Sequence, residues 1–137
     1  MTRQIKVYFA SKLHHSDEIK RHKREGFHFV SRWLETGNLS ESSTKPASHW
    51  QQENYIDIRA SDYVVLFGKE GDNLEGASQE VGYALAWGKP IYVVVSREAG
   101  PKPWMLQGDP QVRRRSSIDS VLNEIWQLQP KLSKLDC

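Results

Sequence analysis

The sequence DNLEGASQEVGYALAWGKPIYVVV, residues 72–95, contains the two features that decide the fold. Residues 91–95 (IYVVV) form an unbroken, largely β-branched run without charge, which is typical of a strand buried on both faces in a parallel sheet. Residues 76–87 show a 3.6-residue period in Val81, Ala84 and Leu85, and Gly88 is a suitable residue to end a helix. The stretch therefore predicts a helix followed by a central strand.

Glu80 lies on an unusual face of this predicted helix. Its neighbours three and four residues away are small or aromatic: Gly76, Ala77, Tyr83 and Ala84. Glu80 is close to the helix start, where Asp72 or Asn73 could cap the free amides and the helix dipole favours an ionised carboxylate. The small neighbours would admit a ligand, but a first-turn Glu that only complements the dipole accounts for the same pattern.

The rest of the chain alternates predicted strands and helices. Apolar or alternating segments predict strands at residues 5–10 (IKVYFA), 27–32 (FHFVSR), 63–68 (YVVLFG), 91–95 and about 111–114. Helices are predicted at residues 17–25, 48–61, 76–87 and 118–128. Ser16 and Ser117 can each cap a helix, and Ser48 with Gln51 has the spacing of a capping box.

This alternation predicts an α/β fold with a doubly wound, five-stranded parallel sheet between two layers of helices. In such folds ligands bind beyond the carboxyl ends of the strands, where the strand order reverses. We therefore expect Ser11, Lys12, residues 68–73 and Glu80 to lie near one crevice. Residues 35–46 are rich in Gly, Asn, Ser and Thr, and we expect them to form a mobile loop that covers it.

Length and composition narrow the class of protein. The 137 residues suit a single domain, and the net charge of +2 gives no case for nucleic acid or an anionic membrane as partner. The single cysteine, Cys137, excludes a disulfide within the chain and fits a reducing compartment. No apolar stretch is long enough to span a bilayer, and the first strand leaves no room for a signal peptide, so we expect a cytoplasmic protein.

Residues 80–90 (EVGYALAWGKP) resemble a segment, E-x-G-x-A-x-x-x-G-K-P, of the nucleoside 2-deoxyribosyltransferase-like superfamily. That family includes deoxyribosyltransferases and 2'-deoxynucleoside 5'-monophosphate N-glycosidases. The resemblance implies the strand order 2-1-3-4-5 of flavodoxin-like, Rossmann-like folds, and Glu80 as the nucleophile that attacks the anomeric carbon of the sugar. Tyr8-Phe9-Ala10 is similar to the family's Y-x-A at the end of strand one, which implies that the Tyr8 hydroxyl hydrogen-bonds Glu80. From the strand pattern alone, Tyr8 is an aromatic core residue.

The resemblance also implies a substrate site. We expect it to be formed by Ser11, Lys12, Asp57, Gly71, Asp72 and Gly76. Lys12, His14 and His15 could hold a 5'-phosphate by charge-assisted hydrogen bonds, or could form an ordinary exposed loop. Asp57 shares a helix face with Trp50, Asn54 and Ser61, and that face could border the site or be solvated. We predict no cofactor and no metal, because adjacent residues such as His14 and His15 seldom converge on one ion and neither G-x-G-x-x-G nor a Walker A motif is present.

Two positions depart from the family pattern. Strand three ends in Phe67-Gly68-Lys69, where many transferases have an Asp, and Leu74 stands where the family places Asp or Ser. Asp72 and Glu75 are close by and could substitute if the loop is shifted. The sequence therefore leaves open which group protonates the departing base.

Two functions from different classes fit these observations. The first is cleavage or transfer of the N-glycosidic bond of a nucleoside or nucleotide through Glu80. The second is a nucleotide-binding or signalling module on the same fold, without turnover. The resemblance also implies a homodimer or larger homo-oligomer, for which Trp50, Tyr55 and Trp87 could supply an interface. Arg113-Arg114-Arg115 is interpreted as a charge-protected edge strand, or else as a contact for a phosphate or a partner.

Overall fold

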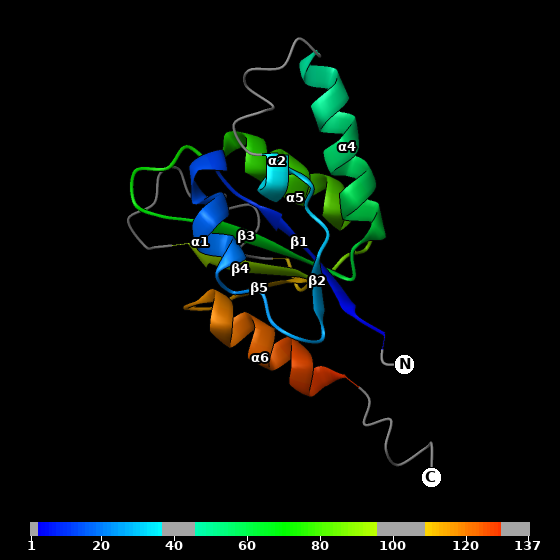
Figure 1. Cartoon of the computed structure of the whole chain (residues 1–137), viewed down its shortest axis with the longest axis vertical. Helices are drawn as coiled ribbons and strands as arrows, with labels where there is room; N and C mark the ends of the chain where they lie inside the picture. Colours follow the sequence, from blue (N-terminus) through cyan, green and yellow to red (C-terminus); the bar gives the residue numbers. More distant parts are fainter. Residues whose placement is uncertain (1–2, 37–45, 96–108, 130–137) are drawn as a thin grey trace.

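The computed structural model describes residues 3–36, 46–95 and 109–129. Its sheet consists of β1 (Ile5–Ala10), β2 (Phe27–Phe29), β3 (Tyr63–Gly68), β4 (Ile91–Val95) and β5 (Val112–Arg114). The strands are hydrogen-bonded in the order β2-β1-β3-β4-β5, and every pair is parallel (Figure 1). The predicted sheet and its strand order are confirmed.

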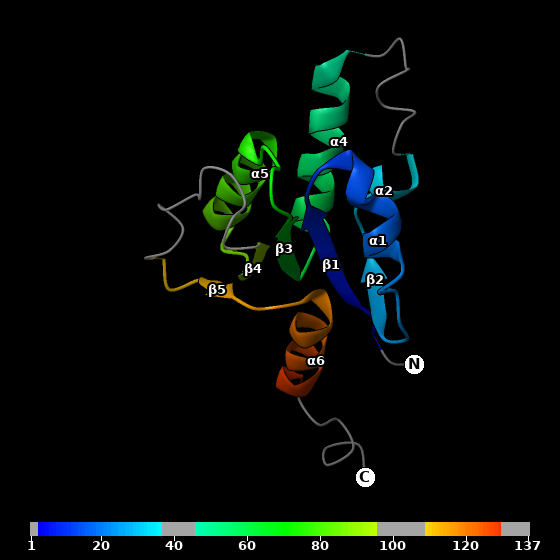
Figure 2. The ribbon, with the colours of Figure 1, turned by 90° about the vertical axis from the view of Figure 1, so that its left-hand side faces the viewer.

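Helices cover both faces of the sheet. They are η1 (Leu13–His15), α1 (Ser16–Lys20), α2 (Trp33–Thr36), α4 (Ala47–Ala60), α5 (Glu75–Ala86) and α6 (Ile118–Leu128). Figure 2 shows α4 and α5 on one side of the sheet and α6 on the other. The segment after α1 contacts α6, because His22 Nδ1 lies 2.9 Å from Asp119 Oδ1. The result is the three-layer α/β fold that the sequence predicts.

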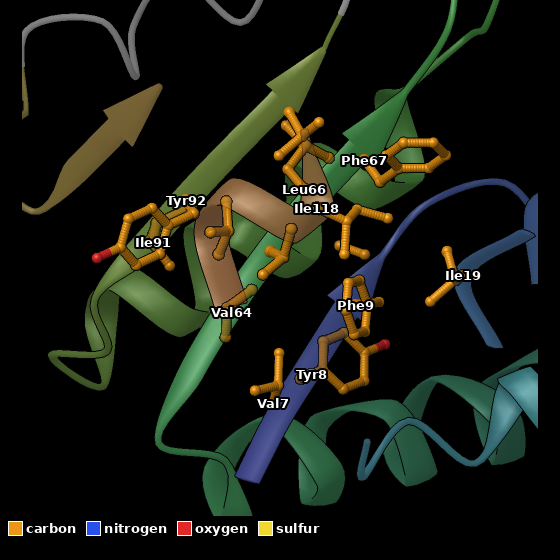
Figure 3. Close-up of a cluster of buried hydrophobic side chains, with 14 of the residues drawn as sticks. Val7, Tyr8, Phe9, Ile19, Val64, Leu66, Phe67, Ile91, Tyr92 and Ile118 are labelled. Carbon is orange, nitrogen blue, oxygen red and sulfur yellow. The ribbon is translucent and has the colours of Figure 1, made fainter. Parts of the chain in front are cut away.

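The three central strands form the core. Side chains of β1, β3 and β4 fill it together with Ile19 of α1 and Ile118 of α6 (Figure 3). Successive residues of a strand point to opposite faces of the sheet. Phe9 therefore packs toward Ile19, whereas Tyr8 points toward α4 and α5, and both side chains are fully buried. Because of this alternation, the Tyr8 hydroxyl lies on the same face of the sheet as Glu80.

Two elements near the N-terminus are shorter than predicted. Helix α1 ends at Lys20 instead of Glu25, because Ile19 is the only buried residue that anchors it. Strand β2 ends at Phe29 instead of Arg32. Beyond it, Ser31 Oγ accepts a hydrogen bond from the backbone N–H of Phe9, and the backbone N–H of Arg32 donates to Asp57, so both residues leave the ladder.

The helix starts also differ in part from the predictions. The capping box of Ser48 with Gln51 is wrong, because α4 begins one residue earlier, after Pro46, and no side chain caps it. Ser117 does cap α6, in a reciprocal capping box with Ser120. Residues 33–36 form the helix α2, so the predicted loop begins later than residue 35; its residues 37–45 lie outside the described part of the chain.

The basic cluster at β5 lies on an edge strand, as predicted. Arg115 Nε donates to Glu124 Oε1 over 2.7 Å, and Arg113 lies 3.6 Å from the same carboxylate. The hydrogen bonds from Arg115 and from the Tyr92 hydroxyl lower the pKa of Glu124 to about 2. Two of the three arginines are therefore used to attach α6 to the edge of the sheet.

Candidate active site

Three elements place polar side chains around one carboxylate oxygen. Glu80 of α5 accepts two hydrogen bonds at Oε2, each 3.1 Å long, from the Tyr8 hydroxyl of β1 and from Asn54 Nδ2 of α4. The contact between Tyr8 and Glu80 that the family resemblance implies is therefore present. Within the described residues, no hydrogen bond reaches the other oxygen, Oε1. One oxygen of the carboxylate is held and the other remains available.

Burial dominates the electrostatics of this carboxylate. It raises the pKa of Glu80 to about 7, although the hydrogen bonds from Tyr8 and Asn54 act in the opposite direction. The expectation that the helix start keeps Glu80 ionised is therefore wrong. Helix α5 begins at Glu75, so Glu80 lies beyond the first turn, where the dipole has little effect. Near neutral pH, Glu80 exists in both protonation states.

Tyr8 is fixed as a hydrogen-bond donor. Its burial and the nearby negative charge of Glu80 raise the pKa of its phenol well above the ordinary value. The hydroxyl therefore keeps its proton throughout the physiological range. It can stabilise the ionised form of Glu80 but cannot itself act as a base there.

The segment after β2 holds α4 in place. Arg32 donates to Asp57 from its backbone N–H over 3.0 Å and from its Nε over 3.0 Å, and its Nη1 lies 3.2 Å from Glu53 Oε1. These bonds fix the turn of α4 that carries Asn54. Burial raises the pKa of Asp57, against the hydrogen bonds and charge of Arg32. Asp57 therefore positions the helix instead of bordering the pocket.

A pocket of about 90 Å³ opens beside Glu80. Its walls come from the segments that follow β1 and β2, including η1 and α2, and from α4 and α5. The lining residues are Ser11, Leu13, Trp33, Thr36, Trp50, Glu53, Asn54 and Glu80. Trp33 is fixed by a 2.8 Å hydrogen bond from its Nε1 to the Phe9 carbonyl. The Ser11 hydroxyl is buried and has no hydrogen-bond partner among the described residues. The pocket thus offers the carboxylates of Glu53 and Glu80, two indole rings and an unsatisfied hydroxyl.

Several residues predicted for the substrate site are not part of this lining. They are Lys12, Asp57, Gly71, Asp72 and Gly76. Asp72 is buried, and its Oδ2 accepts hydrogen bonds of 2.7 Å from the Lys69 backbone N–H and 2.7 Å from His15 Nε2. It therefore does not cap α5, whereas Asn73 Oδ1 accepts from the backbone N–H of Glu75 over 3.0 Å. Gly71 and Gly76 are exposed, and a Cβ at either would meet open space.

The pocket also contains residues that sequence reasoning did not assign to it. Leu13, Trp33, Thr36 and Glu53 were not predicted, and Trp50 and Asn54 were noted only as part of a helix face. Trp33 and Thr36 follow β2, and ligands in this fold bind near the carboxyl ends of the strands. Their position after a predicted strand could therefore have indicated that they lie near the site. Trp50, Glu53 and Asn54 are spaced by three and four residues in α4, which places them on one side of that helix.

A larger hollow of about 390 Å³ lies elsewhere. It is bordered by the first residues of β3 and β4, including Tyr63 and Ile91. This is the opposite edge of the sheet from Glu80. Because ligands of doubly wound folds bind at the carboxyl ends of the strands, the smaller pocket is the better candidate active site.

Only solved structures resemble this chain in the comparisons with known proteins. No protein-family model and no curated protein matches the chain. Among solved structures, the fold is similar to that of a CMP N-glycosidase, BcmB, from Clostridium botulinum, with a TM-score of 0.53 and 17% sequence identity. The alignment covers 90% of this chain and 99% of the other. At this identity the likeness concerns the fold. In the part of the chain that the structure describes, no helix is long and apolar enough to cross a membrane.

Proposed function

We propose that this protein hydrolyses the N-glycosidic bond of a nucleotide, with Glu80 as the nucleophile. One observation carries the proposal. Tyr8 and Asn54 both donate to Oε2 of a pocket-lining carboxylate, and no described residue binds Oε1. This arrangement suits a carboxylate that attacks through one oxygen while hydrogen bonds orient and stabilise the other. The fold of a CMP N-glycosidase supports the same reaction class.

The proposed reaction has two steps. In the first, Oε1 of ionised Glu80 bonds to the anomeric carbon while the C–N bond breaks, and the bonding electron pair leaves with the base, which takes up a proton from solution. In the second, water attacks the same carbon, the glycosyl ester breaks and Glu80 returns to its carboxylate form. The proton that the water loses passes to solution. Transfer would follow the same path, with a second base in place of water.

The pocket limits which part of the substrate enters it. Its volume of about 90 Å³ is well below the roughly 300 Å³ or more of a pocket that encloses a whole small-molecule ligand. We propose that it receives the sugar and that the base lies outward, against Trp33 or Trp50. The buried Ser11 hydroxyl would pair with a sugar hydroxyl or a phosphate oxygen.

A substrate panel tests this function. The full-length protein is incubated with CMP, other ribonucleoside and deoxyribonucleoside 5'-monophosphates, and the corresponding nucleosides, and free base is measured by chromatography. We expect base release from at least one monophosphate. Adding a different free base distinguishes a hydrolase from a transferase, because only a transferase forms the exchanged nucleotide. A nucleotide that raises the melting temperature without any base release would instead support a binding module.

Replacing Tyr8 with Phe should slow the reaction without abolishing it. The change removes one of the two hydrogen bonds to Oε2 and leaves the carboxylate. A hydrogen bond to a charged group contributes about 1.5–3 kcal/mol, which corresponds to a loss of roughly 10- to 100-fold in rate. Because that bond lowers the pKa of Glu80, its loss should also shift the rising limb of the pH–rate profile to higher pH.

Tyr92→Phe is the matched control for Tyr8→Phe. It also removes a buried tyrosine hydroxyl from a carboxylate, Glu124, but at the other side of the sheet. Its pH–rate profile should coincide with that of the parent. A Tyr8→Phe variant with the parent's rate and profile would contradict the role that we propose for Tyr8.

We further propose that the chain forms a homodimer. Trp87, directly after α5, and Ile56 of α4 are 54% and 49% exposed, which is unusual for large apolar side chains. Beside them, Tyr55 and Tyr83 stack with ring centroids 4.0 Å apart. Aromatic side chains are enriched in protein interfaces. Light scattering should report a dimer for the parent, and Trp87→Ser should weaken it. A monomeric parent at micromolar concentration would contradict this proposal.

A further inference from the structure

A second polar cluster lies at the same edge of the sheet, between the loops that follow β1 and β3. His14 and His15 come from the first loop, and Asp72 comes from the second, 57 residues after His15. His15 Nε2 lies 2.7 Å from Asp72 Oδ2, and His14 Nε2 lies 3.6 Å from Asp72 Oδ1. Each oxygen of one carboxylate thus faces a different imidazole.

We propose that His14, His15 and Asp72 bind a divalent transition-metal ion, with Zn²⁺ as the representative. Transition-metal ions such as Zn²⁺ bind well to two imidazoles and one carboxylate. Mg²⁺ and Ca²⁺ instead require mainly oxygen ligands, so this set of side chains favours the transition metals. Three protein ligands also leave one tetrahedral position for water or a ligand. From the sequence we predicted no metal here, because His14 and His15 are adjacent. The third candidate ligand, Asp72, comes from a loop distant in sequence.

The distances are compatible with an ion. The candidate ligand atoms all lie within 4.8 Å of one another. Two ligands bound tetrahedrally at about 2.0–2.2 Å from an ion lie roughly 3.3–3.6 Å apart. An ion would therefore require the more distant ligand atoms to approach one another, and His15 Nε2 and Asp72 Oδ2, now 2.7 Å apart, to separate slightly. The His14 side chain is 64% exposed, which leaves it room to rotate toward Asp72. A hydrogen bond explains why His15 lies beside Asp72 Oδ2. That bond does not explain why His14 faces the other oxygen, Oδ1.

Surrounding contacts hold the two buried ligands in place. The backbone N–H of Lys69 donates to Asp72 Oδ2 over 2.7 Å, and the His15 ring packs edge-on against Phe67, with centroids 5.4 Å apart. Such outer contacts orient metal ligands and are a regular feature of metal sites.

Such an ion would connect two walls of the candidate active site. Ser11 and Leu13, just before His14, line the pocket, and Asp72 lies just before α5, which carries Glu80. A bound ion would replace the hydrogen bond between His15 and Asp72 and would link the segments that follow β1 and β3 by coordination. The proposal does not depend on the glycosidase reaction, because metal binding can be measured without any substrate.

Isothermal titration calorimetry with ZnCl₂ tests the site. It uses the full chain without an affinity tag, in a Cys137→Ser background that removes the only thiol. We expect one Zn²⁺ ion per chain and no heat from MgCl₂. His14→Ala should weaken Zn²⁺ binding by roughly tenfold or more, because it removes one of three ligands. His14 is exposed, so this variant should fold normally.

His49→Ala is the matched control, because His49 lies 3.9 Å from a carboxylate, Glu53, but belongs to no group of three candidate ligands among the described residues. It should bind Zn²⁺ like the parent. Asp72→Asn should reduce affinity as His14→Ala does, provided that its melting curve shows a folded protein. Equal affinity of the parent and His14→Ala, or no binding by the parent, would overturn the proposal.

Discussion

Replacement of Glu80 by Gln is expected to reduce base release by roughly a thousandfold or more. The amide has the size of the carboxylate and can still accept the hydrogen bonds from Tyr8 and Asn54. It is a very poor nucleophile, so the glycosyl ester cannot form. The measurement is the rate of base release from the nucleotide that the substrate panel identifies.

Glu75→Gln provides the matched control for this loss. It makes the same substitution in the same helix, but Glu75 is exposed and lies outside the pocket. Its rate should equal that of the parent. If Glu80→Gln released base as fast as Glu75→Gln, the assignment of Glu80 as nucleophile would be wrong.

The same substitution should stabilise the fold above pH 7. The folded-state pKa of Glu80 is about 7, against an ordinary value of 4.5. Between these values the folded protein binds more protons than the unfolded chain, so stability falls as pH rises from about 4.5 to about 7. At about 1.4 kcal/mol for each pH unit, the full cost of burying the charge is about 3 kcal/mol and is present above pH 7. Gln carries no charge and avoids this cost.

Melting curves at two pH values measure the effect. At pH 8, Glu80→Gln should melt roughly 10 °C above the parent, since about 1 kcal/mol corresponds to a few degrees in a domain of this size. At pH 4.5 the two melting temperatures should be nearly equal. Glu75→Gln should show no such pH-dependent gain, because its carboxylate is exposed. A Glu80→Gln variant that is no more stable than the parent at pH 8 would contradict the raised pKa of Glu80.

A loss of base release together with a gain in stability at pH 8 would identify Glu80 as a residue that serves function and lowers the stability of the fold. A carboxylate whose only role was to complement the helix dipole would stabilise the fold, and its removal would cost stability. Loss of activity combined with a gain in stability at high pH distinguishes the two roles. The pKa of about 7 for Glu80 also predicts that the reaction rate of the parent protein rises with pH and levels off above about 7, because attack requires the ionised carboxylate.

The sequence predicted the central fold well, because local patterns determine it. The bounds of β1, β3 and β4 agree with the prediction, since each is an apolar run that the sheet buries. The prediction was less accurate for α1 and β2, each of which has few buried side chains. Their ends depend on contacts with other segments, such as those of Ser31 and Arg32, which local periodicity cannot show.

The candidate site was only partly predictable for a similar reason. The resemblance singled out Glu80 and Tyr8, which do lie in contact. Asn54 reaches Glu80 only because Arg32 and Asp57 set the position of α4, a contact between segments distant in sequence. The pKa of Glu80 could not be foreseen, because it depends on how far the folded chain removes Glu80 from water and not on the place of Glu80 in its own helix.

The stereochemistry of the product tests the central claim most directly. The parent protein is allowed to act on its nucleotide in a water–methanol mixture, and the methyl glycoside formed is identified by proton NMR. Attack by Glu80 followed by attack of methanol inverts the anomeric carbon twice, so the account predicts a methyl glycoside with the β configuration of the nucleotide. Glu80→Gln should form none. An α-methyl glycoside would show a single direct displacement and would contradict a covalent intermediate on Glu80.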